Sequence, residues 1–355
     1  MGAGLLEKLT ADEPDPLVEC HIVGRHRLTG IESGGDFESG HWLGKYKHGV
    51  ESTSMSGGGH DQPQTTWTTR RLLKWTTDHF KAGGIDSPRV VAEMLLAHVI
   101  GCERMRLYME IDRPATPLER ATLRDLVARA ARNEPVQYLV GHAWFFGRAF
   151  AVNPSVLIPR PCTETLLECV LQWHRTAPGH AQPRIADIGT GCGCIAISLA
   201  VGISDAHLVA TDVDEAALAV ARKNAARHGV ADRIDFCLGA GLGPLEHAAG
   251  EGRFDAICSN PPYICDEEWA QLSPNVRCYE PATALRAGPE GLDVIRPILI
   301  SAGEHLRPQG RLFLEIAHSH RDAVVRIAEE ARWPSNHTVS KDHEGLWRLF
   351  VAERE

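Results

Sequence analysis

Long apolar runs are missing from this sequence of 355 residues. No stretch of about 18 consecutive apolar residues occurs, so we expect no helix that spans a membrane. The N-terminus lacks a basic segment followed by an apolar core, which is the pattern of a secretory signal. We therefore expect a cytoplasmic protein.

Familiar zinc-binding patterns are missing as well. The ten cysteines form no Cys-x-x-Cys pair, and the sequence His-Glu-x-x-His does not occur. Cys192 and Cys194 are too close together for an ordinary zinc knuckle. We expect no metal site, and we interpret the cysteines as reduced, mostly buried thiols of a cytosolic protein.

Basic residues are in the minority, with 37 Lys and Arg against 46 Asp and Glu and a net charge of -9. This balance argues against a large nucleic-acid surface, so we do not expect direct nucleic-acid binding. The hydrophobic content of 43% and the charged content of 23% are typical of a globular protein. The length is sufficient for two domains with cores of their own.

Residues 1–66 show no helical or strand periodicity. They hold 12 of the 33 glycines and ten acidic against five basic residues. We predict a poorly ordered extension over this range. Met55 is the one methionine between Met1 and Met94, so we expect residues 1–54 to be dispensable and interpret them as an over-long start.

Residues 67–135 are predicted to form a small helical domain. The first helix, within 68–80, would bury Leu72, Trp75 and Phe80. The second, within 86–101, would start with Ser87 as N-cap and Pro88 at its first position. Its expected apolar stripe consists of Val91, Met94, Leu95 and Val99.

A third helix, within 116–131, carries a stronger start signal. Thr116 and Glu119 have the spacing of a capping box. The apolar face of this helix would be Leu123, Leu126 and Val127. Aromatic residues and turn glycines then predict a β-hairpin that links the domains over residues 136–156.

Residues 157–355 are predicted to form an α/β domain. Expected strands cover 184–189, 207–212, 233–238, 254–260, 310–316 and 346–352, with helices at 194–202, 215–229 and 294–305. Strands that alternate with helices favour a parallel, doubly wound sheet. Such sheets bind ligands beyond the carboxyl ends of their strands, where the strand order reverses.

The first turn of this domain carries three glycines, Gly189, Gly191 and Gly193. Glycine lets the backbone approach a ligand closely. Asp212 ends the next predicted strand about 20 residues further on, where a carboxylate can bind the two hydroxyls of a ribose. The pattern predicts an adenosine-containing cofactor. It does not separate a nicotinamide enzyme from a methyltransferase.

A rigid elbow, Asn-Pro-Pro-Tyr at residues 260–263, follows the apolar end of a predicted core strand. Pro261 and Pro262 have no N–H, so neither a strand nor a helix continues through them. Backbone carbonyls near Asn260 and Pro261, with the Asn260 carboxamide oxygen, could accept the hydrogens of a planar NH₂ group. The Tyr263 ring could pack against its plane. This geometry would aim an amino or amide nitrogen at an electrophilic methyl group.

The elbow and the glycine loop together resemble the S-adenosylmethionine-dependent amino-methyltransferases. Within that superfamily, the sequence resembles the release factor glutamine methyltransferases in "EPVQYLVGHAWFFGRAFAVNPSVLIPRPCTETLLE" and "CYEPATALRAGPEGLDVIRPIL". The resemblance covers about residues 68–353. It implies a Rossmann-like class I methyltransferase sheet with a small N-terminal helical domain.

The resemblance also implies roles for single residues. The cofactor S-adenosylmethionine would be bound by Asp187, Gly189, Thr190, Gly191, Cys192, Gly193, Asp212, Gly241 and Asn260. The catalytic and substrate-binding residues would be Asn260, Pro261, Pro262 and Tyr263. Pro159, Arg160, Thr163 and Glu164 would line the cofactor mouth. Alternatively, Glu164 is a carboxylate favoured by the N-terminus of a helix, and Arg160 is a surface ion-pair partner.

Two positions depart from the family pattern. Cys162 replaces an acidic residue, which would remove a charged contact. Ala240 stands before Gly241 where the family often has an aspartate for the adenine amino group, which would weaken adenine binding.

The implied activity is methylation of the glutamine side chain in the Gly-Gly-Gln motif of class 1 peptide-chain release factors. That activity would tune translation termination. One alternative is the same chemistry on a ribosomal-protein glutamine or a nucleic-acid amino group. Another is a binding module that has lost its cofactor, which a cofactor-binding measurement would distinguish from an enzyme.

Overall fold

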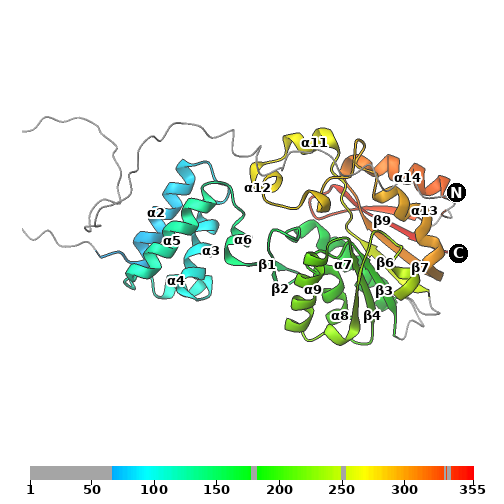
Figure 1. Cartoon of the computed structure of the whole chain (residues 1–355), viewed down its shortest axis with the longest axis horizontal. Coiled ribbons are helices and arrows are strands. Elements are labelled where there is room, and N and C mark those ends of the chain that lie inside the picture. The colour runs from blue at the N-terminus through cyan, green and yellow to red at the C-terminus, as the bar shows by residue number, and fades with distance from the viewer. Residues whose placement is uncertain (1–65, 177–181, 249–252, 332, 334–336) are drawn as a thin grey trace, which may run out of the picture.

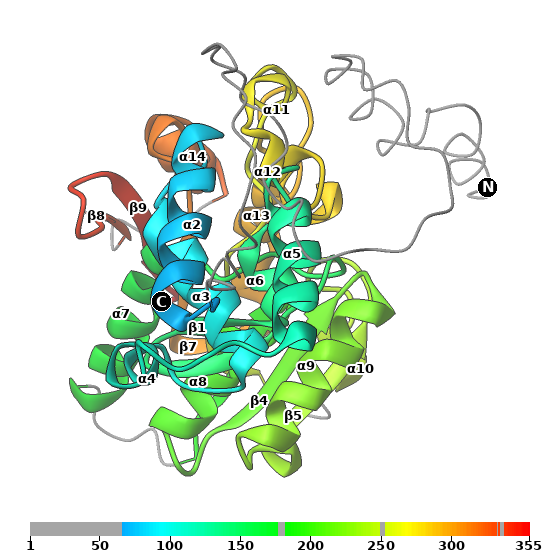
Figure 2. The same cartoon turned by 90° about the vertical axis from the view of Figure 1, so that its left-hand side faces the viewer.

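The computed structural model describes residues 66–176, 182–248, 253–331, 333 and 337–355. The predicted extension over residues 1–66 therefore lies, except for Thr66, outside the described residues. Figure 1 shows a group of helices beside a larger α/β region, with α6, β1 and β2 between them. In Figure 2 the helical group lies in front of the sheet.

The helical region consists of α2 (Thr69–Ala82), α3 (Pro88–Ile100), α4 (Arg104–Met109), α5 (Pro117–Ala130) and α6 (Val136–Val140). The predicted capping box at the start of α5 is confirmed. The Glu119 N–H donates to the Thr116 hydroxyl at 3.2 Å, and the Thr116 N–H donates to the Glu119 carboxylate at 2.8 Å. Leu123, Leu126 and Val127 are buried, as their spacing predicts.

The buried face of α3 differs from the prediction. Of the expected stripe only Leu95 is buried, whereas Val91, Met94 and Val99 are half-buried. The remaining buried residues are Ala92, Glu93, Leu96 and Ala97. Helix α3 contacts α2, α4, α5 and α6, so a broader face than a single stripe is covered.

The predicted hairpin is shorter than expected, because its first part is helical. Helix α6 precedes β1 (His142–Phe145), which pairs antiparallel with β2 (Arg148–Ala151). Leu139 and Val140 of α6 pack into the core of the helical region. The Tyr138 ring joins the core of the α/β region, where its hydroxyl donates to the Val156 carbonyl at 2.6 Å. Packing against both cores thus decides in favour of the helix.

The sheet of the α/β region has seven strands within the described ranges, in the order β5-β4-β3-β6-β7-β9-β8. Their bounds are β3 (Arg184–Ile188), β4 (His207–Asp212), β5 (Ile234–Leu238), β6 (Phe254–Ser259), β7 (Leu306–Glu315), β8 (His337–Lys341) and β9 (Trp347–Glu353). Strands β3 to β7 are parallel, whereas β9 is antiparallel to both β7 and β8. The predicted parallel, doubly wound sheet is confirmed for β3 to β7, and β8 and β9 add antiparallel strands at this edge.

A tight turn explains the reversal at that edge. Strand β8, which the sequence pattern did not reveal, connects directly to β9 through residues 342–346. The Asp342 N–H donates to the Leu346 carbonyl at 2.9 Å, and Gly345 has a φ of 81°. A short turn can join only antiparallel neighbours, since a parallel connection needs a long crossover.

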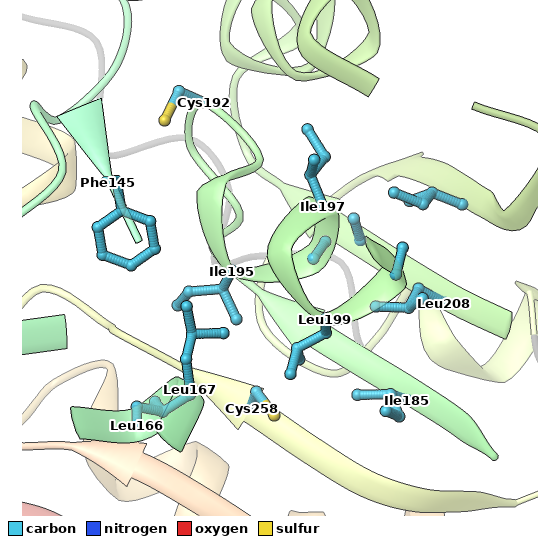
Figure 3. Close-up of a cluster of buried hydrophobic side chains, with 14 of the residues drawn as sticks. Phe145, Leu166, Leu167, Ile185, Cys192, Ile195, Ile197, Leu199, Leu208 and Cys258 are labelled. Carbon is cyan, nitrogen blue, oxygen red and sulfur yellow. The ribbon is translucent and has the colours of Figure 1, made fainter. Parts of the chain in front are cut away.

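Helices cover both faces of the sheet. One face carries α7 (Glu164–Thr176), α8 (Cys194–Gly202) and α9 (Glu215–Arg227); the other carries α10 (Leu245–Ala248), α13 (Ile295–His305) and α14 (Arg321–Glu330). The short helices α11 (Asp266–Gln271) and α12 (Pro274–Arg277) follow β6. Figure 3 shows the first layer, where Leu199 of α8 lies near Ile185 and Leu208 of the sheet and Leu166 and Leu167 of α7 lie beside Cys258 of β6. No helix in the described ranges is long and apolar enough to cross a membrane.

The cysteines are less buried than expected. Eight of those in the described part of the chain are free thiols. Cys192 and Cys258 are buried, and the other six are half-buried.

Strand order places the two sequence motifs at one edge of the sheet. The order reverses between β3 and β6, because β4 lies on one side of β3 and β6 on the other. The glycine loop follows β3, and the Asn-Pro-Pro-Tyr elbow follows β6. Since β3 and β6 are parallel neighbours, both motifs leave the sheet at its carboxyl edge.

Candidate active site

The glycine loop after β3 leaves open space beside the backbone of its first two glycines. Gly189 and Gly191 have φ angles of 72° and 55°, a conformation that favours glycine. A Cβ atom at either position would meet no heavy atom within 4 Å. At Gly193 a Cβ would lie 2.8 Å from Ile197 Cδ1 and 3.2 Å from Ala221 Cβ. The first two glycines therefore leave room for a ligand, and the third allows α8 to pack against α9.

Asp187 accepts hydrogen bonds from the glycine loop and from the helix that follows it. Its side chain is fully buried, and its Oδ2 accepts from the Thr190 hydroxyl at 2.7 Å and from the Ala196 N–H at 3.1 Å. Burial raises the pKa of the Asp187 carboxyl to about 6. Its Oδ1 has no hydrogen-bond partner within the described residues. A cationic or N–H donor at this edge would satisfy that oxygen.

Asp212 ends β4 beside the loop. Its Oδ2 accepts from the Gly191 N–H at 2.8 Å, and its Oδ1 accepts from the Asp214 N–H at 3.0 Å. Burial raises the pKa of the carboxyl, while these backbone donors oppose the shift. Each carboxylate oxygen keeps a further lone pair. A half-buried, oriented carboxylate of this kind can accept the two hydroxyls of a ribose.

Two apolar side chains beside Asp212 were missed by the sequence analysis. Val213 and Leu238 are each 56% exposed, at the carboxyl ends of the neighbouring strands β4 and β5. A flat apolar ring, such as a nucleobase, would cover them. The loop that follows contains the exposed Ala240 and then Gly241, which has a φ of 54°. An apolar residue directly after the strand-ending Asp212 was the available sequence signal.

The elbow after β6 is held at its asparagine. Asn260 Nδ2 donates to the Thr163 hydroxyl at 3.0 Å. Thr163 is buried and belongs to the short 3₁₀ turn η1 (Pro161–Thr163) that precedes α7. Because the NH₂ group is used in this way, the carboxamide oxygen is the atom of Asn260 left for a substrate amide. The structure thus brings together two segments that the sequence analysis assigned to one site.

Tyr263, at the other end of the elbow, contacts Glu315 at the end of β7. The Tyr263 hydroxyl lies 3.5 Å from Glu315 Oε1, and Cys162 Sγ lies 3.6 Å from the same oxygen. Burial raises the pKa of the Glu315 carboxyl and brings the pKa of the Cys162 thiol to about 11. An acidic residue at position 162 would set two carboxyl groups side by side. In this chain the Cys162 thiol is instead a neutral donor to Glu315.

Arg160 and Glu164 brace the segment before α7. Arg160 pairs with the buried Glu280 at 2.5 Å, in keeping with the ion-pair alternative. Glu280 also accepts from the Ile158 N–H at 3.1 Å. The Glu164 carboxylate accepts from the Phe146 N–H at 2.7 Å, in the turn of the β1–β2 hairpin. These bonds fix the segment that carries Thr163.

Asn224 is a site-supporting residue that the sequence analysis missed. It is fully buried on α9. Its Nδ2 donates to the carbonyls of Cys192 and Ala151, and its Oδ1 accepts from the Ala151 N–H at 2.8 Å. One side chain therefore ties the glycine loop to β2. An asparagine on the buried side of an otherwise alanine-rich helix was the available signal.

Two protein-family models match the chain. Residues 71–141 match the family described as PrmC N-terminal domain, and residues 162–273 match the family described as Methyltransferase small domain. Together these matches cover most of the helical region and the first part of the α/β region, including both motifs of the site.

Curated relatives match over most of their length. A release factor glutamine methyltransferase of Geobacter sulfurreducens is 42% identical over 259 residues, which cover 73% of this chain and 87% of the relative. One of Rhodopirellula baltica is 38% identical over 291 residues, which cover 82% and 97%. Among solved structures, a methyltransferase from Pyrococcus furiosus is 20% identical, with a TM-score of 0.41, over 64% of this chain and 96% of that chain.

Proposed function

The chain belongs to the release factor glutamine methyltransferases, and from this premise we propose how its site works. The protein transfers a methyl group from S-adenosylmethionine to the side-chain amide nitrogen of a release factor glutamine. The observation that carries this assignment is the elbow at residues 260–263 beside the glycine loop at residues 189–193, at one edge of the sheet.

The residues of the carboxyl edge fit S-adenosylmethionine. Backbone at Gly189 and Gly191 has open space above it, where the methionine part would lie. Asp212 would bind the ribose hydroxyls, and the exposed Val213 and Leu238 would contact the adenine. When bound, this cofactor supplies an electrophilic methyl group on a sulfonium ion.

The elbow orients the substrate amide. The Asn260 carboxamide oxygen and a backbone carbonyl near Pro261 would accept the two hydrogens of the glutamine NH₂ group. These acceptors hold the nitrogen lone pair in line with the methyl group and strengthen as positive charge develops on nitrogen. As the new N–C bond forms, the S–C bond to the methyl group would break and S-adenosylhomocysteine would leave. The nitrogen proton becomes acidic as this happens and would pass to water, so no strong base is needed beforehand.

The domains divide the work in this proposal. Residues 67–135 dock the release factor, residues 136–156 link the domains, and residues 157–355 perform the chemistry. The acceptor is the glutamine of the Gly-Gly-Gln motif in class 1 factors, and the reaction tunes translation termination in the cytoplasm. Support comes from the match of residues 71–141 to a domain family named separately from the methyltransferase domain.

Mass spectrometry tests the substrate. The full chain is incubated with S-adenosylmethionine and a purified class 1 release factor, and the factor is then digested. We expect one added methyl group on the peptide with Gly-Gly-Gln, and none on a factor with Gly-Gly-Ala. Methyl transfer to DNA adenine or to a ribosomal-protein glutamine, with none to the release factor, would overturn the assignment.

A further inference from the structure

One short segment of the α/β region contacts three separate parts of the molecule around the site. Residues 279–287, which we call the bridging segment, lie between the short helix α12 and helix α13. They form hydrogen bonds to the helical region, to the segment that leads to η1, and to the end of the elbow. In Figure 1, α12 lies on the side of the α/β region that faces the helical group. The function proposed above gives the bridging segment no task.

Tyr279 connects the bridging segment to the helical region. Its ring is half-buried and packs against the core of the α/β region. Its hydroxyl donates to the Arg132 carbonyl at 2.9 Å, across 147 positions of the sequence. Arg132 lies in the turn between α5 and α6. Domains of one chain are expected to move relative to each other unless their interface restrains them, so this bond restrains the end of α5.

Glu280, the next residue, connects the bridging segment to the turn that carries Thr163. Its side chain is buried, accepts from the Ile158 N–H at 3.1 Å and pairs with Arg160 at 2.5 Å. Arg160 is the N-cap of η1, and Thr163 ends that turn. The Thr163 hydroxyl in turn accepts from Asn260 Nδ2 at 3.0 Å. Glu280 therefore supports the asparagine end of the elbow through one short turn.

The far end of the bridging segment contacts the other end of the elbow. Ile264 follows Tyr263 directly. The Ile264 N–H donates to the Leu285 carbonyl at 2.8 Å, and the Ile264 carbonyl accepts from the Ala287 N–H at 2.9 Å. Both ends of the elbow are therefore attached to the same short stretch of chain.

We infer that the bridging segment couples the docking of the release factor on the helical region to the orientation of its glutamine in the site, with Tyr279 and Glu280 as the positioning residues. The inference rests on the proposed function. A substrate that is bound by the helical region and methylated at the elbow has to span both, so the distance between them has to be fixed. Tyr279 and Glu280 are adjacent in the chain but bond to opposite sides, so a displacement of one residue displaces the other.

Tyr279→Phe tests the contact to the helical region. The variant keeps the ring and loses one hydrogen bond, so the helical region samples orientations that do not fit the factor. The apparent affinity falls with the fraction of molecules that are competent to bind. We expect the KM for the release factor to rise at least about threefold and kcat to stay within about twofold of wild type. A wild-type KM would overturn the inference.

Glu280→Gln tests the contact to the site and should show the opposite division. The variant keeps the shape of the side chain but loses the ion pair with Arg160. We expect kcat at saturating factor and cofactor to fall at least about tenfold, because the acceptors of the elbow lose their fixed position. The KM for the factor should stay within about twofold of wild type, since the bond from Tyr279 is unchanged.

Asp255→Asn is the matched control for Glu280→Gln. The buried Asp255 also accepts from one backbone N–H, that of Arg184 at 2.8 Å, and pairs with one arginine, Arg307 at 3.0 Å. It lies at the opposite end of β6 from the elbow. Both variants should lower the melting temperature, but Asp255→Asn should keep the wild-type kcat. A wild-type kcat in folded Glu280→Gln, or an equal loss in Asp255→Asn, would contradict the positioning role.

Hydrogen exchange without cofactor or factor keeps the inference separate from the proposed function. In Tyr279→Phe we expect amide exchange at least about twofold faster in peptides that cover residues 158–163, although the removed hydroxyl bonds to Arg132, outside this range. Tyr108→Phe is the control, because its hydroxyl bonds to Arg89 within the helical region, and its exchange over residues 158–163 should match the wild type.

The two hypotheses fail in different ways. Unchanged exchange over residues 158–163 in Tyr279→Phe would refute the coupling, whether or not the release factor is the substrate. A wild-type chain that leaves the release factor unmethylated would instead refute the proposed function.

Discussion

Asn260 donates its carboxamide hydrogen to Thr163 across 3.0 Å, although the two residues are 97 positions apart in the sequence. The bond joins the Asn-Pro-Pro-Tyr elbow after β6 to the turn before α7. It also assigns the two halves of the carboxamide to different tasks, because the nitrogen holds the elbow and the oxygen is left for the substrate.

This division predicts the effect of two substitutions at Asn260. Asn260→Ala removes the aimed acceptor and should reduce methyl transfer by about 10²- to 10³-fold, with cofactor affinity nearly unchanged. Asn260→Asp keeps an acceptor but loses the donor to Thr163, so it should fail nearly as badly. Single-turnover rates at saturating cofactor, with affinity measured separately, provide the check. Near-normal methyl transfer by Asn260→Ala would show that Asn260 does not orient the substrate and that the elbow only ends the strand.

Asp187 predicts a pH dependence of stability. Folding raises its pKa from 3.8 to about 6, so the native state keeps a proton that the unfolded state has lost. Its contribution to stability therefore falls as the pH rises from about 4 to about 6. At neutral pH the cost is about 3 kcal/mol, since one unit corresponds to about 1.4 kcal/mol.

Asp187→Asn cannot titrate and removes this cost. Relative to the wild type, the variant should gain about 3 kcal/mol of unfolding free energy between pH 4 and pH 7. Denaturant unfolding at a series of pH values measures the difference. A difference that stays constant with pH would contradict the raised pKa of Asp187.

Ala240 predicts a gain of affinity. The residue is exposed beside Gly241, where an added side chain has space. In Ala240→Asp the carboxylate could accept from the adenine amino group, a bond worth about 1.5 to 3 kcal/mol when well aligned. We expect the dissociation constant for S-adenosylmethionine to fall by about tenfold or more, as measured by calorimetry. Ala240→Asn serves as the uncharged comparison, and an unchanged constant for Asp would show that another group contacts the adenine.

Asn224 predicts a combined loss of stability and affinity. Asn224→Leu has a similar volume but leaves the Ala151 N–H and two carbonyls without their partner. Each buried unsatisfied group costs about 1 to 3 kcal/mol, so the melting temperature should fall by several degrees. Because the Cys192 carbonyl belongs to the glycine loop, cofactor affinity should fall as well. Normal cofactor affinity in the folded variant would show that Asn224 does not affect cofactor binding through the glycine loop.

Much of the architecture was predictable because its signals are local. The capping box of α5 needs only Thr116 and Glu119, which are three residues apart. Alternating strands and helices predicted the α/β region, and the elbow at residues 260–263 predicted the end of a buried strand. Backbone preferences of glycine and proline act at the residue itself, so they do not depend on distant partners.

Predictions from local sequence patterns were wrong where tertiary packing determines the secondary structure or the strand direction. The first part of the expected hairpin became α6, because Leu139 and Tyr138 fill two different cores. Strand β9 runs antiparallel, because the turn at residues 342–346 joins it to β8. The hydrophobic periodicity of a segment does not show that a second core or a neighbouring strand will pack against it.

The sequence by itself determined which chemical groups the proposed site contains: three loop glycines, Asp212 and the Asn-Pro-Pro-Tyr elbow. Only the tertiary structure decided how these groups are oriented. Thr163 reaches Asn260 from another element, Glu315 reaches Tyr263 from β7, and Asn224 reaches the glycine loop from α9. A hydrogen bond depends on distance and direction between atoms, and for residues this far apart in the chain both are set by how the sheet and its helices pack.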